Sequence, residues 1–467
     1  MTDPQPDWDA LTVRADDLLR RLFPICRSIT GDGLRATLRL LRKTTDLFLT
    51  EVPSGTVCYD WIVPDEWNVR DAFVADATGR RVIDFLASNI HLVNYSIPFA
   101  GILTFEELAP HLHTLPDLPD AIPYRTSYYK RDWGFCLTHA QFQKLDKKEK
   151  YHVVVDSSLA PGSLTYGEAF LPGTLREPQG GESGQEYLVS TYVCHPSLAN
   201  DNLSGVVLWA LLLAELRKRH LYHSYRFVIA PETIGALAYI AHNEAAVKAL
   251  SGGFVATTVA GPGRFGYKAT WRGDAVIDQA VRRTFRELNL DYVEYPFDVN
   301  GSDERQYSTP GLRLPVGTIC KDKYYEYPYY HTSLDNLDFI SAANLVETLK
   351  LYWLAIEKLE QNRAYRSLNP IGEPMLGKRG LYPQTGGAIK QKAASMASHS
   401  ERGYKVDAGN ILYGSELDAI RWVLFYADGV TPLLEVAEKT GLPMKQLHEV
   451  AEKLVAAKLL EEVRASA

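Results

Sequence analysis

The segment 187–216 constrains the fold more than any other part of the sequence. It begins with a strand-like run at 187–193, continues through a loop that contains His195 and Asp201, and ends in an apolar helical run at 206–216. A strand, a loop and a helix in this order are typical of an α/β sheet, where functional groups follow the carboxyl ends of the strands. An imidazole and a carboxylate in such a loop suit a divalent metal, with zinc as the first choice.

The same two residues also have a purely structural interpretation. Asp201 stands at the mouth of the predicted helix, where a carboxylate often caps the first backbone N–H groups. His195 could then be an ordinary hydrogen-bonded loop residue. The sequence of this segment alone leaves both interpretations open.

Strand and helix patterns alternate from residue 150 to residue 362. Strands are predicted at 152–156, 163–170, 187–193, 225–230, 253–259 and 314–320, and helices at 203–219, 234–250, 274–288 and 341–361. This alternation predicts an α/β domain with a mixed, mostly parallel sheet sandwiched by helices. Two amphipathic helices in residues 1–50 are expected to cover the same sheet, so the domain, 1–50 and 150–362, is discontinuous.

The remaining residues predict three further parts. Residues 51–149 contain short β-rich runs separated by Pro, Gly, Asp and Asn, which indicates an inserted antiparallel β domain that either roofs a cleft or serves only as a packing module. Residues 363–400, rich in Pro, Gly, Ser and Lys, are expected to form a connector. Residues 401–467 contain three helical runs with a turn at 441–443 and a short β-like end, a pattern that resembles a winged helix.

Charge and composition narrow the class of partner. The chain of 467 residues has a net charge of −7, and residues 401–467 hold eleven acidic against eight basic side chains. This surface would repel phosphates, so we expect no nucleic-acid partner and a docking or dimerisation role for the winged helix, in a homo-oligomer. Neither a signal peptide nor a membrane-spanning run is found, and the five cysteines are scattered, so a cytoplasmic protein with no membrane partner and no disulfide framework is expected.

Glu232 is a candidate general base. It follows a buried-looking strand and precedes a predicted helix, so its carboxylate would lie at the edge of the sheet, partly removed from water. There it could accept a proton from a metal-activated water molecule. The alternative is that Glu232 merely complements the dipole of the helix that follows.

The loop 301–307 carries two further candidates. Asp303 could hold a metal-binding histidine by a hydrogen bond. Arg305 could bind a carboxylate of the substrate, or it could only neutralise Asp303 and Glu304. Function and structure explain this loop equally well.

The loop 324–336 is a run of tyrosines that leads to His331. Tyr330 and its neighbours could supply apolar walls and hold the substrate. Asp335 could orient a ring nitrogen of a ligating histidine, or it could simply begin the turn before the next helix.

At these segments the chain resembles the zinc aminopeptidases and glutaminyl cyclases of the co-catalytic metallopeptidase superfamily. Five further segments are distinctive: Arg-Ser-Ile-Thr-Gly-Asp-Gly at 27–33, Tyr-Tyr-Lys-Arg-Asp-Trp-Gly-Phe-Cys at 128–136, Cys-His-Pro-Ser at 194–197, Pro-Glu-Thr-Ile-Gly at 231–235 and Leu-Gly-Lys-Arg-Gly-Leu-Tyr-Pro at 376–383. With these segments the chain more closely resembles, over nearly its whole length, a bacterial family of aminopeptidase-like proteins that combines a peptidase domain, an inserted β domain and a C-terminal winged helix.

Carried over by position, the resemblance implies that His195, Asp201 and His331 are metal ligands and that Glu232 is the general base. The implied activity is that of a metal-dependent amide hydrolase acting on a peptide or a small molecule. Two alternatives stay open: an acyl-transfer or cyclising enzyme with a single zinc, and a non-catalytic protein that senses a ligand and works through its winged helix.

The sequence departs from the two-zinc pattern of the superfamily in three places. Thr233 stands where a second Glu ligand is expected, residues 255–261 lack the expected Asp, and Glu304 replaces the His of the Ser-Asp-His motif. Because two of the usual ligands are missing, one zinc ion is expected rather than two. Three protein ligands and an open fourth position are also typical of catalytic zinc.

Overall fold

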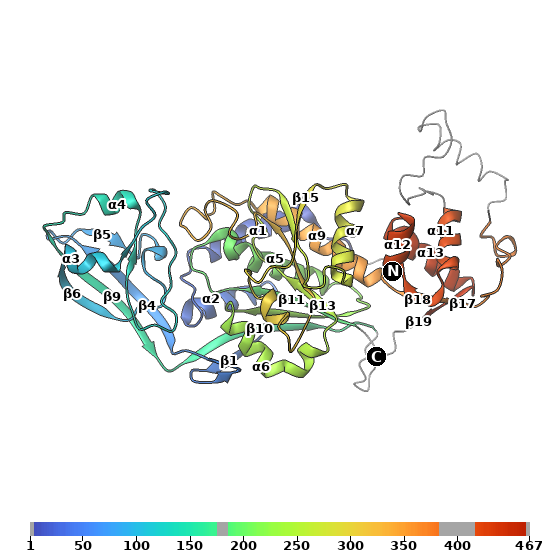
Figure 1. Ribbon diagram of the computed structural model, residues 1–467, viewed down its shortest axis with the longest axis horizontal. Helices are drawn as coiled ribbons and strands as arrows, with labels where there is room; N and C mark the ends of the chain where they lie inside the picture. The colour runs from blue at the N-terminus through green and yellow to red at the C-terminus, as the bar shows by residue number, and fades with distance from the viewer. Residues whose placement is uncertain (1–3, 175–184, 383–415, 464–467) are drawn as a thin grey trace, which may run out of the picture. The chain divides into compact units, whose positions relative to one another are not determined.

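The computed structural model describes residues 4–174, 185–382 and 416–463 (Figure 1). It forms two compact units, the first holding most residues up to Tyr352 and the second holding 279–290 and the part from Trp353 onward. Within the described ranges, no helix is both long and apolar enough to cross a bilayer. Part of the predicted connector, 383–400, and the beginning of the predicted winged helix, 401–415, lie outside the described residues.

An eight-stranded mixed sheet is the core of the first unit. Its order is β1 (Phe48–Pro53), β10 (Ser163–Leu171), β12 (Ser224–Ala230), β11 (Glu186–Tyr192), β13 (Gly252–Val255), β16 (Val316–Lys321), β14 (Phe265–Lys268) and β15 (Tyr292–Tyr295). The central strands β12, β11, β13 and β16 are parallel neighbours, whereas β10 pairs antiparallel with β12 and β14 pairs antiparallel with β16. The predicted fold class, a mostly parallel sheet sandwiched by helices, is confirmed.

Helices cover both faces of this sheet. They are α1 (Trp8–Leu22), α2 (Asp32–Leu41), α5 (Gly205–Leu216), α6 (Ile234–Lys248) and the first half of α9 (Ala342–Gln361), whereas α7 (Val276–Glu287) belongs mostly to the second unit. In Figure 1, α5 and α6 lie on opposite sides of the sheet. Every residue of α5 is buried, because this helix packs against β11 on one side and under α1 on the other. Its continuous apolar sequence is what such a sandwiched helix requires.

The inserted domain is a four-stranded antiparallel sheet. Its order is β5 (Arg81–Asp84), β4 (Glu66–Ala75), β9 (Lys150–Ala160) and β6 (Phe99–Thr104). The strand predicted at 152–156 as part of the α/β region is the centre of β9 and therefore belongs here. Its buried residues alternate, with Tyr151, Val153 and Val155 on one face, which is the pattern of a half-covered antiparallel strand. Conversely, β1 joins the main sheet, and the short strands β14 and β15 were not predicted.

Several shorter elements complete the first unit. They are β2 (Val57–Cys58), β3 (Trp61–Ile62), β7 (Leu112–His113), β8 (Phe135–Cys136), α3 (Phe105–Leu108), α4 (His139–Gln143) and α8 (Glu304–Tyr307). Of these, α8 is one turn long, follows Asp303 directly and packs against β16.

The second unit has the architecture of a winged helix. Strands β18 (Asp428–Pro432), β17 (Ala364–Ser367) and β19 (Leu460–Val463) form an antiparallel sheet, with helices α11 (Glu416–Phe425), α12 (Leu433–Thr440) and α13 (Met444–Ala456). The three helices agree with the sequence prediction. In contrast, the predicted connector at 363–400 begins with β17, the central strand, whose Tyr365 is 2% exposed.

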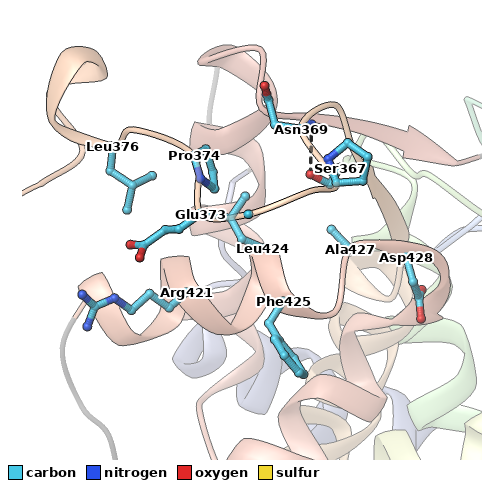
Figure 2. A pocket seen from close by; sticks show the side chains of 12 residues that line it. Ser367, Asn369, Glu373, Pro374, Leu376, Arg421, Leu424, Phe425, Ala427 and Asp428 are labelled. Carbon is cyan, nitrogen blue, oxygen red and sulfur yellow. Dashed lines mark hydrogen bonds between the residues drawn. The ribbon is translucent and has the colours of Figure 1, made fainter.

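A hollow of about 600 Å³ lies within this second unit (Figure 2). Helix α11 supplies Arg421, Leu424 and Phe425, and the segment after β17 supplies Glu373 and Pro374 among others. None of its lining residues is a metal-ligand candidate from the sequence. All of the predicted site residues lie in the first unit.

Candidate metal centre

Three loops at the carboxyl edge of the main sheet carry the predicted site residues. His195 and Asp201 follow β11, Glu232 follows β12 by two residues, and His331 lies between β16 and α9. Because β11, β12 and β16 point in the same direction, the segments that leave them meet at one edge of the sheet.

The structure brings the three predicted metal ligands together. One ligand atom from each of His195, Asp201 and His331 lies within 4.8 Å of the others. Asp201 Oδ2 is 3.8 Å from His195 Nε2 and 2.9 Å from His331 Nε2. Both Asp201 Oδ2 and His331 Nε2 are buried, yet neither is oriented for a hydrogen bond. Buried polar atoms that face one another without a hydrogen bond are typical of a cation site, so these residues fit a metal ion.

Asp201 does not cap the helix that follows it. Helix α5 begins at Gly205 with Ser204 as its N-cap residue, whereas Asp201 lies in the irregular turn η3 (Ala199–Ser204). Its second oxygen, Oδ1, accepts the hydroxyl of Tyr192 at 2.5 Å. The carboxylate is therefore directed toward the histidines rather than toward the helix.

The electrostatics of the cluster favour the forms that bind metals. Burial lowers the pKa of His195 to about 4, which keeps the imidazole neutral at physiological pH. Burial alone would raise the pKa of Asp201, but the charge of His195, the interaction with His331 and the Tyr192 hydroxyl together lower it to about 2. The cluster thus presents a carboxylate and a neutral imidazole over a wide pH range.

Glu232 lies beside this cluster and outside the helix that follows. Helix α6 begins at Ile234, so Glu232 precedes its first turn. The hydroxyl of Ser302 donates to Glu232 Oε1 at 2.9 Å. Burial and the charge of Asp201 raise the pKa of Glu232 to about 7, although Ser302, His331 and Arg305 act in the opposite direction. A carboxyl group with a pKa near neutrality is suited to accept and release a proton.

The loop 301–307 supports Glu232 rather than a histidine. Asp303 Oδ1 accepts the backbone N–H of Thr233 at 2.8 Å, which fixes the turn just after Glu232. Burial and the neighbouring charge of Glu232 raise the pKa of Asp303 well above its usual range. Arg305 is exposed, and its positive charge acts on both Asp303 and Glu232.

Glu304, which stands where the resemblance leads us to expect a histidine, has a structural role. Its Oε1 forms an ion pair of 2.7 Å with Lys268 Nζ, and both side chains are 1% exposed. It also accepts the hydroxyl of Tyr324 at 2.9 Å and the backbone N–H of Ser302 at 3.1 Å. The pair therefore joins the loop beneath Glu232 to β14 and to the tyrosine loop.

The tyrosine loop packs against His331 and behind Asp201. Tyr330 stacks on the imidazole of His331 with ring centroids 3.9 Å apart and an interplanar angle of 14°. Asp335 contacts no imidazole; its carboxylate accepts the backbone N–H groups of Asn200 and Asp201 at 2.6 and 3.0 Å. Asp335 therefore holds the loop that carries Asp201 and does not orient a ring nitrogen, as the sequence had led us to expect.

Two residues of the site had no role in the sequence analysis. Tyr124, from the inserted domain, has its ring centroid 5.2 Å from that of His195 and 5.3 Å from that of His331. Arg27, 2% exposed, donates to the carbonyl oxygens of His195 and Pro196 at 2.7 Å each. Arg27 lies in a segment that carried the family resemblance, but no spacing in the sequence connects either residue to the histidines.

This fold and this cluster of side chains define an aminopeptidase-like α/β protein with a C-terminal winged helix. The chain belongs to the family described as "Domain of unknown function (DUF4910)", whose profile matches residues 16–362. A winged helix-turn-helix profile matches residues 363–399 and 404–462, which includes β17 and agrees with the architecture of the second unit.

Similar proteins support the same classification. A Clostridium acetobutylicum protein, provisionally named a polysaccharide biosynthesis protein with an aminopeptidase-like domain, is 42% identical over 447 residues and 96% of each chain. The crystal structure of a provisionally named peptidase from Clostridium acetobutylicum is 40% identical and covers 98% of each chain, with a TM-score of 0.85. BSAP, a zinc aminopeptidase from Bacillus subtilis, shares the fold at 14% identity, with a TM-score of 0.53 over 77% of this chain and 96% of its own.

Proposed function

We propose that the chain is a metal-dependent amide hydrolase that resembles an aminopeptidase and binds a single zinc ion. The observation that carries the proposal is the convergence of His195, Asp201 and His331, whose ligand atoms lie within 4.8 Å of one another. The unpartnered buried atoms of Asp201 and His331 support it, because a cation would satisfy both. The absence of carboxylates at Thr233 and at 255–261 supports one ion rather than two.

Each group around the cluster would have a distinct task. When bound, zinc would supply a Lewis acid that polarises a carbonyl group and lowers the pKa of water. Glu232 would take a proton from the attacking water and pass it to the leaving amine. Ser302 holds one oxygen of that carboxylate, which leaves the other available for the proton. Tyr124 and Tyr330 pack against the imidazoles and would limit the access of water.

The substrate class is an amide of a peptide or of a small molecule. The exposed guanidinium of Arg305, whose charge acts on Glu232, would attract a carboxylate of the substrate. The name of the Clostridium acetobutylicum relative refers to polysaccharide biosynthesis, which supports testing amides of amino sugars as well as peptides. A cyclising or acyl-transfer reaction is the second candidate, supported by the reduced set of metal ligands.

The test begins with elemental analysis of the purified protein, which should contain one zinc ion per chain. A screen of aminoacyl and acylated small molecules in ¹⁸O-labelled water then separates the two candidate reactions, because only hydrolysis incorporates the label. Glu232→Gln should retain its zinc and lose turnover by about 10²- to 10⁴-fold. Unchanged turnover in this variant would reject Glu232 as the general base.

A further inference from the structure

Cys194 lies directly beside the proposed metal centre. Its side chain is 2% exposed, and its Sγ is 3.6 Å from Nδ1 of His195. The sulfur also accepts the backbone N–H of Glu232 at 3.3 Å. The thiol is thus in contact with one proposed metal ligand and with the backbone of the proposed base, and the hydrolytic mechanism above does not use it.

A second group of ligand atoms forms around this sulfur. One atom from each of Cys194, His195 and Glu232 lies within 4.8 Å of the others. His195 belongs to both groups and offers a different nitrogen to each, since Nδ1 is beside the sulfur and Nε2 is 3.8 Å from Asp201 Oδ2. Thiolate, imidazole and carboxylate together favour a softer cation than the oxygen and nitrogen ligands of the first group.

We propose that Cys194, His195 and Glu232 form a second cation site, which takes a soft divalent cation and shares His195 with the first. On binding, the cation replaces the thiol proton at Sγ and, when His195 Nε2 already holds zinc, the proton at Nδ1 as well; both protons are released to solvent. The consequence for activity rests on the proposed function: a cation held by Glu232 would occupy the base that hydrolysis needs. A soft cation would therefore act as an inhibitor of the zinc-loaded protein.

A purely structural interpretation of Cys194 makes a different prediction. As a small buried side chain that accepts the N–H of Glu232, it would give no response to metals. Cys194 and His195 are buried, whereas Glu232 is half-buried.

Cadmium is the probe that distinguishes them. The zinc-loaded protein is titrated with Cd²⁺ while the ultraviolet charge-transfer band of a cadmium–thiolate bond and the bound metal are measured. The wild type should develop a saturable band, Cys194→Ser and Cys194→Ala should lose it, and Cys136→Ser, which removes a buried thiol that belongs to neither group, should retain it. Glu232→Gln should weaken cadmium binding by about tenfold or more, since it removes a charged ligand.

Two results would overturn the second site: no band in the wild type, or a band of the same size in both Cys194 variants. Circular dichroism of each variant establishes that it is folded, and the Glu232→Gln titration tests the site with the thiol intact. A different result would reject the proposed function while leaving the second site intact. If the protein holds no zinc but still develops the band through Cys194, the second site stands and the single-zinc hydrolase does not.

Discussion

The carboxylate of Asp335 lies directly behind the backbone of Asp201. Its Oδ2 accepts the N–H of Asp201 at 3.0 Å, and its Oδ1 accepts the N–H of Asn200 at 2.6 Å. Burial raises the pKa of Asp335 to about 7, although these N–H groups lower it. Two contacts to consecutive backbone groups fix the direction in which the Asp201 side chain leaves its loop.

Asp335→Asn should therefore weaken zinc binding without unfolding the protein. The amide can accept only one of the two N–H groups well, and loss of such supporting contacts typically lowers metal affinity by about 10- to 100-fold. A competition titration against a chelator measures the change. Asp338→Asn, at an exposed position nearby in the same segment, is the matched control and should leave affinity unchanged. Equal affinities of Asp335→Asn and wild type would contradict the positioning role.

The raised pKa of Glu232 predicts how its replacement changes stability with pH. Because the folded-state pKa is about 7 and the ordinary value is 4.5, ionisation of Glu232 destabilises the folded metal-free protein as pH rises through this window. Glu232→Gln should thus stabilise the metal-free protein above pH 7, by on the order of 3 kcal/mol, and have little effect below about pH 4.5. Urea denaturation of both proteins across this range measures the difference.

Glu244→Gln is the control for that experiment. Glu244 lies exposed on α6, and hydrogen bonds from Lys248 and Tyr59 lower its pKa. Glu244→Gln should slightly destabilise the protein at neutral pH, which is opposite in sign to the effect of Glu232→Gln. If Glu232→Gln showed no pH dependence relative to wild type, the carboxyl group would not be held in the environment described here.

Removal of the metal should destabilise the protein. A ligand that binds only the folded state adds about 4 kcal/mol when its concentration is 1,000 times its Kd, so a chelator should lower the Tm and added zinc should restore it. Because the pKa of His195 is about 4 and that of Asp201 about 2, these two ligands keep their metal-binding forms at pH 6, where an unperturbed imidazole would be largely protonated. In Asp201→Asn the Tm should no longer respond to zinc, and a response of wild-type size would exclude Asp201 as a ligand.

The sequence predicted the strands that position the site because buried parallel strands are continuous apolar runs. The runs at 187–193 and 225–230 end within two residues of His195 and Glu232, and parallel strands bring their carboxyl ends to one edge. The strand predicted at 152–156 belongs as β9 to the inserted sheet, and the alternation of Tyr151, Val153 and Val155 on its buried face is the sequence signal that distinguishes it from a fully buried parallel strand.

Other parts of the site could not be predicted from spacing. Arg27 and His195 are 168 residues apart, and nothing in either segment indicates that a guanidinium will reach that carbonyl oxygen. Tyr124 enters the site from the inserted domain, whose role as roof or packing module the sequence left open. Its contacts with both imidazoles support the first interpretation. The homo-oligomer, the cytoplasmic location and the absence of a nucleic-acid partner stay predictions.

The ion pair of Lys268 and Glu304 holds the loop beneath Glu232. Both side chains are 1% exposed, so removal of one partner leaves the other charged and unpaired in the interior. Lys268→Met should therefore lower the free energy of unfolding by about 3–5 kcal/mol, a typical cost of an uncompensated buried charge.

The double variant Lys268→Met with Glu304→Gln identifies the cause of that loss. Glu304→Gln removes the charge while its amide oxygen can still accept the hydroxyl of Tyr324, so the double variant should be more stable than Lys268→Met alone. Lys248→Met, which breaks an exposed pair with Glu244, should change stability little. The free energy of unfolding is measured by urea denaturation in the presence of a chelator, so that metal binding does not contribute to the differences between variants. A double variant no more stable than the single one would mean that lost packing, rather than the buried charge of Glu304, destabilises the protein.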